Sequence, residues 1–314
     1  MNREKRPIVI VNQKGDSMKI GIIGLGKMGL MLARNLRDHQ IDVIGYDVNE
    51  AIKKSVSDIT ITESIDDLLL NLNTPRIVWM MLPAGQPTDD MVNILTSRLS
   101  AGDILIDGGN SHFKDSISHF EESAKKSIHF LDVGTSGGID GARNGACMMI
   151  GGEEAIFKSI EPLFNAINVE SGYMYCGPAG SGHYLKMIHN GIEYGMMQSI
   201  AEGFNVLYHS DYDYDLESVA RVFSNGSVIR GWLMELTEKL LSVDSTLDDI
   251  EGVVFASGEG SWTVSEALRL QVPIPVITQS LFARYTSQDS DKYGEKLLAS
   301  LRNQFGGHSV QKKE

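Results

Sequence analysis

The feature that most constrains the fold of this chain is a run of glycines that follows its first clearly apolar segment. Residues 19–24 have the composition of a short buried strand, and Gly24, Gly26 and Gly29 then supply the spacing G-x-G-x-x-G at the start of a helical pattern. In a strand–turn–helix unit these glycines allow a tight turn, close approach of the backbone to a pyrophosphate, and close packing of helix against strand. The pattern predicts the first unit of a dinucleotide-binding sheet.

The second predicted strand strengthens this interpretation. Residues 42–46 are mostly apolar and lead directly into Asp47. This carboxylate comes about 20 residues after the glycine turn, where the dinucleotide fingerprint places an acid for the ribose hydroxyls. A glycine turn that binds no ligand is the alternative, and the double match makes it the weaker one.

Three further strands are expected at 76–82, 103–107 and 128–133, with helices between them at 64–71, 88–98 and 113–126. This alternation is typical of a doubly wound sheet, in which ligands bind at the carboxyl ends of the strands. The loops at those ends are 83–85, 107–111 and 134–138, and the last two are rich in glycine, hydroxyl and amide groups. Either loop alone could be a simple turn. Together they favour hydrogen bonding to a polyhydroxylated ligand.

The pattern changes after residue 178, where strands stop and helices are expected at 180–209, 215–224, 228–242, 246–251, 262–270, 275–287 and 291–304. We therefore predict an α/β fold, an N-terminal Rossmann-type doubly wound sheet followed by an all-α domain. The expected boundaries are a non-core extension at 1–17, a nucleotide-binding domain at 18–178, and a helical substrate and dimerisation domain at 179–314. A helical layer this thin is expected to bury its apolar faces against a second subunit.

The long helix predicted at 180–209 carries an apolar stripe and, beside it, a polar one. Lys186, His189, Asn190 and Glu193 recur at i, i+3, i+4 and i+7, which places a cation, an imidazole, an amide and a carboxylate on one side of the helix. A merely solvated face is the alternative interpretation. Two glycines, 191 and 195, each cost about 1 kcal/mol in a helix and suggest close approach by another element. We expect this face to be functional.

Composition narrows the possible classes of function. The chain is 42% hydrophobic and 22% charged, as in ordinary globular proteins, and its net charge of −13 argues against a nucleic-acid partner. Its two cysteines, Cys147 and Cys176, fit neither a metal site nor a disulfide framework, which favours the cytoplasm. No apolar run reaches transmembrane length and no metal-ligand cluster appears, so we expect neither a membrane nor a metal partner.

These motifs, in their order and spacing, resemble the decarboxylating 6-phosphogluconate dehydrogenases in a short form with one helical half. The resemblance covers residues 18–308 and rests on the segments 24–29 (GLGKMG), 107–111 (DGGNS), 136–138 (SGG), 186–194 (KMIHNGIEY), 281–284 (LFAR) and 302–308 (RNQFGGH). It implies oxidative decarboxylation of 6-phosphogluconate to ribulose 5-phosphate and CO2, in the pentose phosphate pathway.

The resemblance also implies residue roles. Lys186 would be the base that takes the hydroxyl proton, which requires a depressed lysine pKa, and Glu193 would protonate the enediol, which requires a raised carboxyl pKa. The substrate-binding residues implied are Asn110, Ser136, Gly137, Gly138, His189, Asn190, Tyr194, Arg284, Arg302 and His308. The cofactor-binding residues are Gly24, Leu25, Gly26, Lys27, Met28, Gly29, Asp47, Leu82, Pro83, Ala84 and Asn110. For His189 and Arg302, structural roles are the alternatives.

Two departures from the family pattern are informative. Where many relatives have a lysine before Trp-Thr, this chain has Ser261, so one cation for the substrate phosphate is missing. Where NADP-dependent members carry Asn-Arg-Thr after the second strand, this chain has 47–49 (DVN). A carboxylate repels a 2′-phosphate and no adjacent arginine holds one, so we expect NAD rather than NADP as the cofactor, although Lys53 and Lys54 could weaken the discrimination.

The implied partners are a phosphorylated sugar acid and a second copy of the chain, in a homodimer or tetramer whose tail residues Arg302 and His308 complete the neighbour's site. The nearest alternative is another β-hydroxyacid dehydrogenase, of the 3-hydroxyisobutyrate or glyoxylate reductase type, with the same lysine. A catalytically silent NAD-binding scaffold is the alternative of another class, and it would be expected to have lost Lys186 or Glu193.

Overall fold

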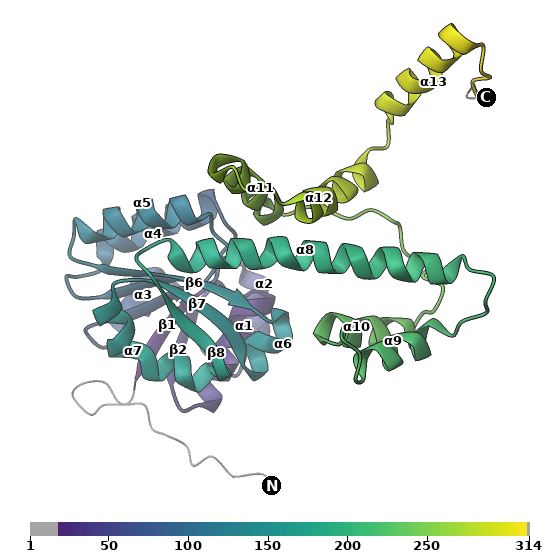
Figure 1. Ribbon diagram of the computed structural model, residues 1–314. Coiled ribbons are helices and arrows are strands. Elements are labelled where there is room, and N and C mark those ends of the chain that lie inside the picture. The colour runs from purple at the N-terminus through teal and green to yellow at the C-terminus, as the bar shows by residue number, and fades with distance from the viewer. Residues whose placement is uncertain (1–17, 313–314) are drawn as a thin grey trace. The chain divides into compact units, whose positions relative to one another are not determined.

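The computed structural model describes residues 18–312 (Figure 1). The chain divides into two compact units, one ending at His189 and the other beginning at Asn190. Helix α8 (Ser181–Tyr208) is continuous across this boundary. Each unit is described by itself.

The first unit is built on one sheet with the strand order β3-β2-β1-β4-β5-β6-β7-β8. The strands are β1 (Lys19–Ile23), β2 (Asp42–Tyr46), β3 (Thr60–Ile61), β4 (Ile77–Met80), β5 (Ile104–Asp107), β6 (His129–Ser136), β7 (Ala146–Gly152) and β8 (Asn168–Gly177). Neighbours from β3 to β6 run parallel, β7 is antiparallel to β6, and β8 is parallel to β7. The order reverses beside β1, which places the ligand crevice of a doubly wound sheet at the end of that strand.

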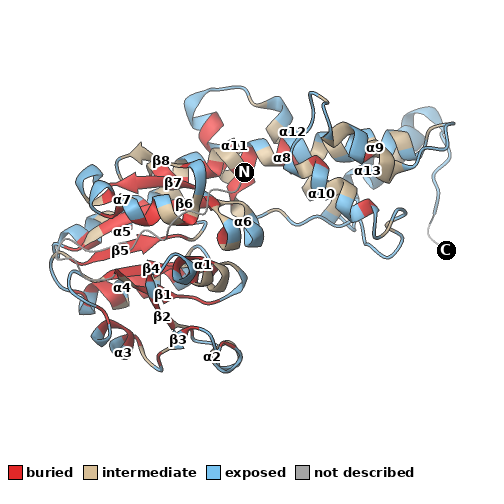
Figure 2. Cartoon of the chain, turned by 90° about the horizontal axis from the view of Figure 1, so that it is seen from below, coloured by how far each residue is buried: buried red, intermediate tan, exposed pale blue. Residues whose placement is uncertain are grey.

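Helices cover both faces of this sheet. They are α1 (Lys27–Asp38), α2 (Glu50–Ser55), α3 (Ile65–Leu70), α4 (Gln86–Arg98), α5 (Phe113–Ala124), α6 (Gly138–Asn144) and α7 (Glu154–Ile167). One apolar cluster joins the sheet to α1 and α7, and another joins it to α3 and α4. The central strands β4 and β5 are buried along their whole length (Figure 2), because parallel strands are covered on both faces. The predicted fold class is confirmed.

Strands β7 and β8 were not predicted from the sequence. β7 reads as a continuous apolar run that ends in Gly151 and Gly152, and glycine weakens a strand prediction. The structure explains the first of these glycines. A Cβ on Gly151 would lie 2.5 Å from Oδ1 of Asp132 and 2.7 Å from the backbone nitrogen of Gly182, so only glycine allows α8 to approach the sheet here.

The second unit contains the remainder of α8 together with α9 (Leu216–Ser224), α10 (Trp232–Leu241), α11 (Gly258–Leu270), α12 (Pro275–Gln288) and α13 (Tyr293–Gly306). The helix predicted at 246–251 is wrong. Asp244 accepts hydrogen bonds through one carboxylate oxygen from the backbone N–H groups of Thr246 and Leu247, and Leu247 has a φ of 56°. This side-chain turn competes with helix formation.

The core of the second unit is small. Ala220, Met234 and Leu241 are buried, and Phe204 and Phe223 pack against them with ring centroids 6.4 Å apart. Many large apolar side chains of this unit are exposed in the single chain. Among the described residues, no helix is long and apolar enough to cross a membrane.

Candidate functional site

The structure explains two of the three glycines in the turn after β1 by geometry and leaves the third beside open space. Gly24 has a φ of 91°, in the left-handed region that favours glycine. A Cβ on Gly29 would lie 1.9 Å from the carbonyl oxygen of Gly24, so α1 packs directly on the turn. Gly26 faces open space, and no side chain caps the N-terminus of α1 behind it. The turn leaves room for a pyrophosphate beside the helix N-terminus.

Asp47 holds this turn at the end of β2. Its carboxylate accepts a hydrogen bond from the Leu25 backbone N–H at 2.7 Å and another from the Asn49 N–H at 2.8 Å. The side chain is 8% exposed and lines the cavity beside the turn. Each carboxylate oxygen can accept more than one hydrogen bond, so Asp47 can bind ribose hydroxyls without releasing the turn.

A cavity of about 490 Å³ lies beside the glycine turn. Its lining includes many of the residues expected to bind the cofactor: Gly24, Gly26, Lys27, Met28, Gly29, Asp47, Leu82, Pro83 and Asn110. Leu25 is buried and contributes its backbone N–H to Asp47, and Ala84 is exposed outside the lining.

Val48, Met81, Gly108, Gly109 and Thr135 also line this cavity and were not expected there. Gly108, Gly109 and Thr135 belong to the loops 107–111 and 134–138 that the sequence marked for ligand binding, and Val48 and Met81 each adjoin a residue expected to bind the cofactor. The hydroxyl of Thr135 is buried without a hydrogen-bond partner in the described part of the chain. An open glycine turn, a carboxylate at the end of the second strand and this hydroxyl fit a dinucleotide.

A second set of polar residues meets where α8 crosses β6. Nε2 of His189 lies 3.1 Å from Oγ of Ser136, and Nδ1 of His189 lies 3.5 Å from Nζ of Lys186. Lys186 is 6% exposed. An amine held out of bulk solvent and within hydrogen-bonding reach of a substrate hydroxyl is the kind of group that general-base chemistry uses. The structure thus joins three residues that are up to 53 positions apart in the sequence.

Glycines in the sheet bring α8 this close. A Cβ on Gly134 of β6 would lie 2.3 Å from Cβ of Lys186, so the lysine stem rests on the strand backbone. Asn190 is buried as well, whereas Ile192 and Met196 of the expected apolar stripe are each 52% exposed in the single chain. The interpretation of the polar stripe as a solvated face is therefore wrong for Lys186 and Asn190.

The loop that carries Asn110 is fixed by the carboxylate of Asp107, at the end of β5. Asp107 accepts hydrogen bonds from the Gly109 backbone N–H at 3.0 Å and from the Ser111 hydroxyl at 2.7 Å. Asp107 itself is fully buried, and Asn110 is exposed at the cavity. At the end of β6, Gly137 and Gly138 have φ values of 110° and 59°, which glycine adopts without strain.

His183 is a buried residue that the sequence interpretation missed. Its Nε2 lies 3.0 Å from the carbonyl oxygen of Gly109 and its Nδ1 lies 2.7 Å from Oγ of Ser116 on α5. It lies one helical turn before Lys186 on α8. Extending the polar stripe back by one turn would have found it, because 183, 186, 190 and 193 continue the same helical spacing.

In the second unit, the structure pairs two residues that the resemblance assigns to the substrate phosphate. The guanidinium carbon of Arg284 lies 3.4 Å from the ring centroid of Tyr194, and Nη1 of Arg284 donates to the carbonyl of Phe255 at 3.1 Å. The Tyr194 hydroxyl lies 2.8 Å from Oγ of Ser257. A Cβ on Gly260 would lie 2.6 Å from the Tyr194 ring, so α11 packs on α8 there.

The residue that replaces the missing lysine is turned back onto its own helix. Ser261 donates its hydroxyl hydrogen bond to the carbonyl of Gly258 at 2.8 Å. The close approach predicted at Gly191 is present, since a Cβ there would lie 2.8 Å from a methyl carbon of Thr263. At Gly195 the nearest atom, on Val276, would be 3.4 Å away, which is an ordinary contact.

The remaining predicted residues lie on α8 and at the C-terminal end. Glu193 is half-buried. Arg302 on α13 and His308 after it are both exposed, and the carbonyl of His308 accepts a hydrogen bond from Asn303 at 2.8 Å. Both residues are therefore exposed in the single chain.

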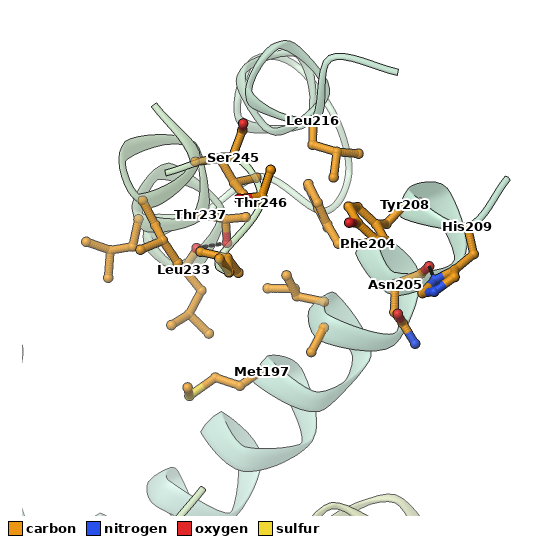
Figure 3. A pocket seen from close by; sticks show the side chains of 16 residues that line it. Met197, Phe204, Asn205, Tyr208, His209, Leu216, Leu233, Thr237, Ser245 and Thr246 are labelled. Carbon is orange, nitrogen blue, oxygen red and sulfur yellow. Dashed lines mark hydrogen bonds between the residues drawn. The ribbon is translucent and has the colours of Figure 1, made fainter. Parts of the chain in front are cut away.

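A groove in the second unit is distinct from all of these residues. It has a volume of about 600 Å³ and is lined by the C-terminal part of α8, by α10 and by the turn at 245–247 (Figure 3). Its lining is mostly apolar, with Phe204, Leu216 and Leu233 among the side chains that point into it. It contains no residue expected to bind substrate or cofactor. Among residues 18–312, no group of His, Cys, Asp and Glu is placed to hold a metal ion.

Comparisons with known proteins also divide the chain into two domains, with the division close to the start of α8. Residues 19–177 match the model of the NAD-binding domain of 6-phosphogluconate dehydrogenase, and residues 182–314 match the model of its C-terminal domain. The Bacillus subtilis protein YqeC is 50% identical over 298 residues, which cover 94% of this chain and all of that protein. The NAD(+)-dependent decarboxylating 6-phosphogluconate dehydrogenase of Haloferax volcanii is 39% identical over 301 residues, which cover 95% of this chain and all of that enzyme.

A solved structure of Plasmodium falciparum 6-phosphogluconate dehydrogenase is also similar, with a TM-score of 0.77 and 29% identity. The match covers 94% of this chain but only 66% of that longer chain. The resemblance inferred from the sequence motifs is confirmed. The chain belongs to the 6-phosphogluconate dehydrogenase family.

Proposed function

We propose that this chain catalyses the oxidative decarboxylation of 6-phosphogluconate to ribulose 5-phosphate and CO2, with NAD as the hydride acceptor. The observation that carries the proposal is the buried Lys186, set against His189 and Ser136 on the strand next to the dinucleotide cavity. The similarity to an NAD-dependent decarboxylating relative over that enzyme's full length supports it. The chemistry needs a base at a secondary alcohol, beside a bound dinucleotide.

In the first step Lys186 removes the proton of the substrate's carbon-3 hydroxyl. Bound NAD supplies the acceptor for the hydride that leaves the same carbon. His189 orients the lysine amine, because its Nδ1 faces Nζ while its Nε2 is held by the Ser136 hydroxyl. The residues of the glycine turn, with Asp47, would hold the dinucleotide in its cavity.

In the second step the 3-keto acid loses CO2. The ammonium of Lys186, now carrying the proton it removed, passes that proton to the ketone oxygen as the bond to the carboxylate breaks, and so neutralises the negative charge that develops there. Glu193 then protonates carbon 1 of the resulting enediol while Lys186 takes back the proton from the oxygen, which leaves the ketone of the product. Helix α8 carries both groups, seven positions apart.

The primary test is a steady-state assay with NAD and NADP against 6-phosphogluconate, unphosphorylated gluconate and 3-hydroxyisobutyrate, with released CO2 quantified. We expect one CO2 for each NADH formed on 6-phosphogluconate. Activity confined to a non-phosphorylated acid would favour the other β-hydroxyacid dehydrogenases. The inability to use a phosphorylated substrate would then be attributed to Ser261, which stands where many relatives have a phosphate-binding lysine. NAD binding without turnover of any acid would favour the silent scaffold.

The cofactor preference is attributed to Asp47. A 2′-phosphate near this carboxylate would meet a like charge in a partly buried site, where repulsion is poorly screened. The relatives include both NAD- and NADP-dependent enzymes, so the preference has to be measured on this chain.

We expect Asp47→Ala to lower the ratio of kcat/KM for NAD to that for NADP by about 10- to 100-fold, the scale of one lost charged hydrogen bond plus one removed repulsion. Most of the change should be a raised KM for NAD, since the variant also loses the two bonds that hold the turn. Asp42→Ala, at the exposed start of the same strand, is the control and should keep the wild-type ratio. An unaltered ratio in Asp47→Ala would locate the specificity elsewhere.

We further propose that the active form is at least a homodimer whose C-terminal tail completes the partner's substrate site. No residue of α13 is buried, and its Leu297, Leu301 and Phe305 are between 48% and 78% exposed. The apolar groove of Figure 3 is a second large apolar surface on the same unit. Monomers rarely expose apolar surfaces of this extent, so a second copy is the expected cover.

A complementation experiment tests the tail. A heterodimer of Lys186→Met and Arg302→Ala chains should recover about half of the wild-type activity, because the chain with an intact lysine receives an intact tail from its partner. Each homodimer should be nearly inactive. The matched control pairs a wild-type chain with a chain carrying both substitutions, and it should stay nearly inactive. The reverse pattern would mean that Arg302 serves its own subunit.

A further inference from the structure

We infer that His183 is a positioning residue for the reaction: it holds the Gly108–Asn110 segment in register with the N-terminal turn of α8, and so sets the distance between the bound dinucleotide and Lys186. The inference rests on the proposed function, because it assigns His183 a role in that chemistry. The imidazole is 1% exposed and bridges two parts of the first unit that are 74 residues apart in sequence.

The hydrogen bonds of His183 specify which atom makes this link. The carbonyl of Gly109 can only accept, so Nε2 carries the ring proton and donates to it across 3.0 Å. Nδ1 then accepts from the hydroxyl of Ser116, which lies 2.7 Å away. Both ring nitrogens are therefore used, and the ring cannot rotate without breaking a buried hydrogen bond.

The backbone at the start of α8, which carries His183, is also held in place by hydrogen bonds. The fully buried carboxylate of Asp132 accepts from the backbone N–H of Gly180 at 2.7 Å and from that of His183 at 2.9 Å. These are two of the donors that a helix N-terminus leaves without an intrahelical partner. The first turn of α8 is thus attached to β6, and His183 projects from that anchored turn.

The loop side is fixed by Asp107, which binds the Gly109 N–H and the Ser111 hydroxyl. The Asp107 carboxylate therefore binds the backbone N–H of Gly109, and His183 binds the carbonyl oxygen of the same residue. Gly108, Gly109 and Asn110 line the dinucleotide cavity. A shift of this loop would therefore change where the cofactor lies relative to α8, and misplacement by about 1 Å can cost about 100-fold in rate.

The experiment compares His183→Gln with His183→Asn in the full-length protein. The glutamine amide places an N–H near the position of Nε2 and can keep the bond to Gly109, whereas the asparagine oxygen lies near Nδ1 and keeps only the bond to Ser116. We expect kcat for His183→Gln to stay within about threefold of wild type and kcat for His183→Asn to fall about 100-fold. Both variants lose one buried hydrogen bond, so their melting temperatures should fall alike.

Two readouts separate positioning from a loss of folded enzyme. With substrate deuterated at carbon 3, the isotope effect on kcat should rise in His183→Asn and not in His183→Gln, and this ratio is independent of how much enzyme is folded. Amide hydrogen exchange of residues 108–111 in the NAD complex should be faster in His183→Asn alone.

Equal loss of kcat in the two variants, or unchanged exchange of residues 108–111 in His183→Asn, would overturn the positioning role. The exchange measurement does not depend on turnover. A wild-type protein that is inactive on 6-phosphogluconate would therefore refute the proposed function while the link between His183 and Gly109 is still decided.

Discussion

Lys186→Met is expected to reduce kcat by at least about 1,000-fold while leaving the affinity for NAD within about twofold of wild type. The buried amine is the proposed base, and methionine removes it while keeping the length of the side chain. The stem of Lys186 rests on the backbone of Gly134, so an alanine substitution would leave a cavity there. The effect of losing the base could then not be separated from the effect of losing its packing. The measurements are steady-state kinetics and NAD titration by protein fluorescence.

The matched control for this substitution is Lys158→Met on α7. Lys158 is exposed and pairs with Glu154 four residues away, so its loss should change kcat by less than about twofold. The lining of the dinucleotide cavity does not include Lys186, which is why NAD binding should survive its removal. Turnover above about one-tenth of wild type in Lys186→Met would remove the lysine from the role of base.

Glu193→Gln is expected to lower kcat about 100-fold, because glutamine cannot donate a carboxyl proton to the enediol. It should also change where the product's proton comes from. In D2O the wild-type enzyme should place deuterium at a single stereochemical position on carbon 1 of ribulose 5-phosphate. The variant should release the enediol, which water protonates from either face, and NMR of the product distinguishes the two outcomes.

Glu202→Gln on the same helix is the control for Glu193. Glu202 is exposed and accepts a hydrogen bond from Gln198, so its substitution should leave both kcat and the stereochemistry unchanged. Stereospecific deuteration at an unchanged rate in Glu193→Gln would mean that another group supplies the proton.

The fold of the first unit follows largely from local sequence signals. The spacing of Gly24, Gly26 and Gly29 predicts the turn after β1, and the structure supplies a steric reason for Gly24 and for Gly29. Short apolar runs predicted β1, β2, β4, β5 and β6 correctly. Such signals depend on residues a few positions apart, so they can be recognised without knowing the tertiary contacts.

The sequence signals failed where long-range contacts decide the local conformation. Gly151 of β7 has to be glycine because α8 packs directly against it, and no residue near it in the sequence indicates that contact. The expected helix at 246–251 was replaced by a turn in which Asp244 binds two backbone N–H groups. In both cases a specific tertiary or side-chain contact, rather than the average conformational preference of the residues, determined the local structure.

In the candidate site, too, local spacing could be interpreted from the sequence and long-range contacts could not. By itself, the sequence identified Lys186, His189 and Glu193 as one face of a helix, because helical periodicity follows directly from spacing. It could not determine that this polar face is largely the buried one, or that His183 binds Gly109. These outcomes depend on how closely α8 approaches β6 and on hydrogen bonds between segments more than 50 residues apart, which form only when the tertiary structure brings them together.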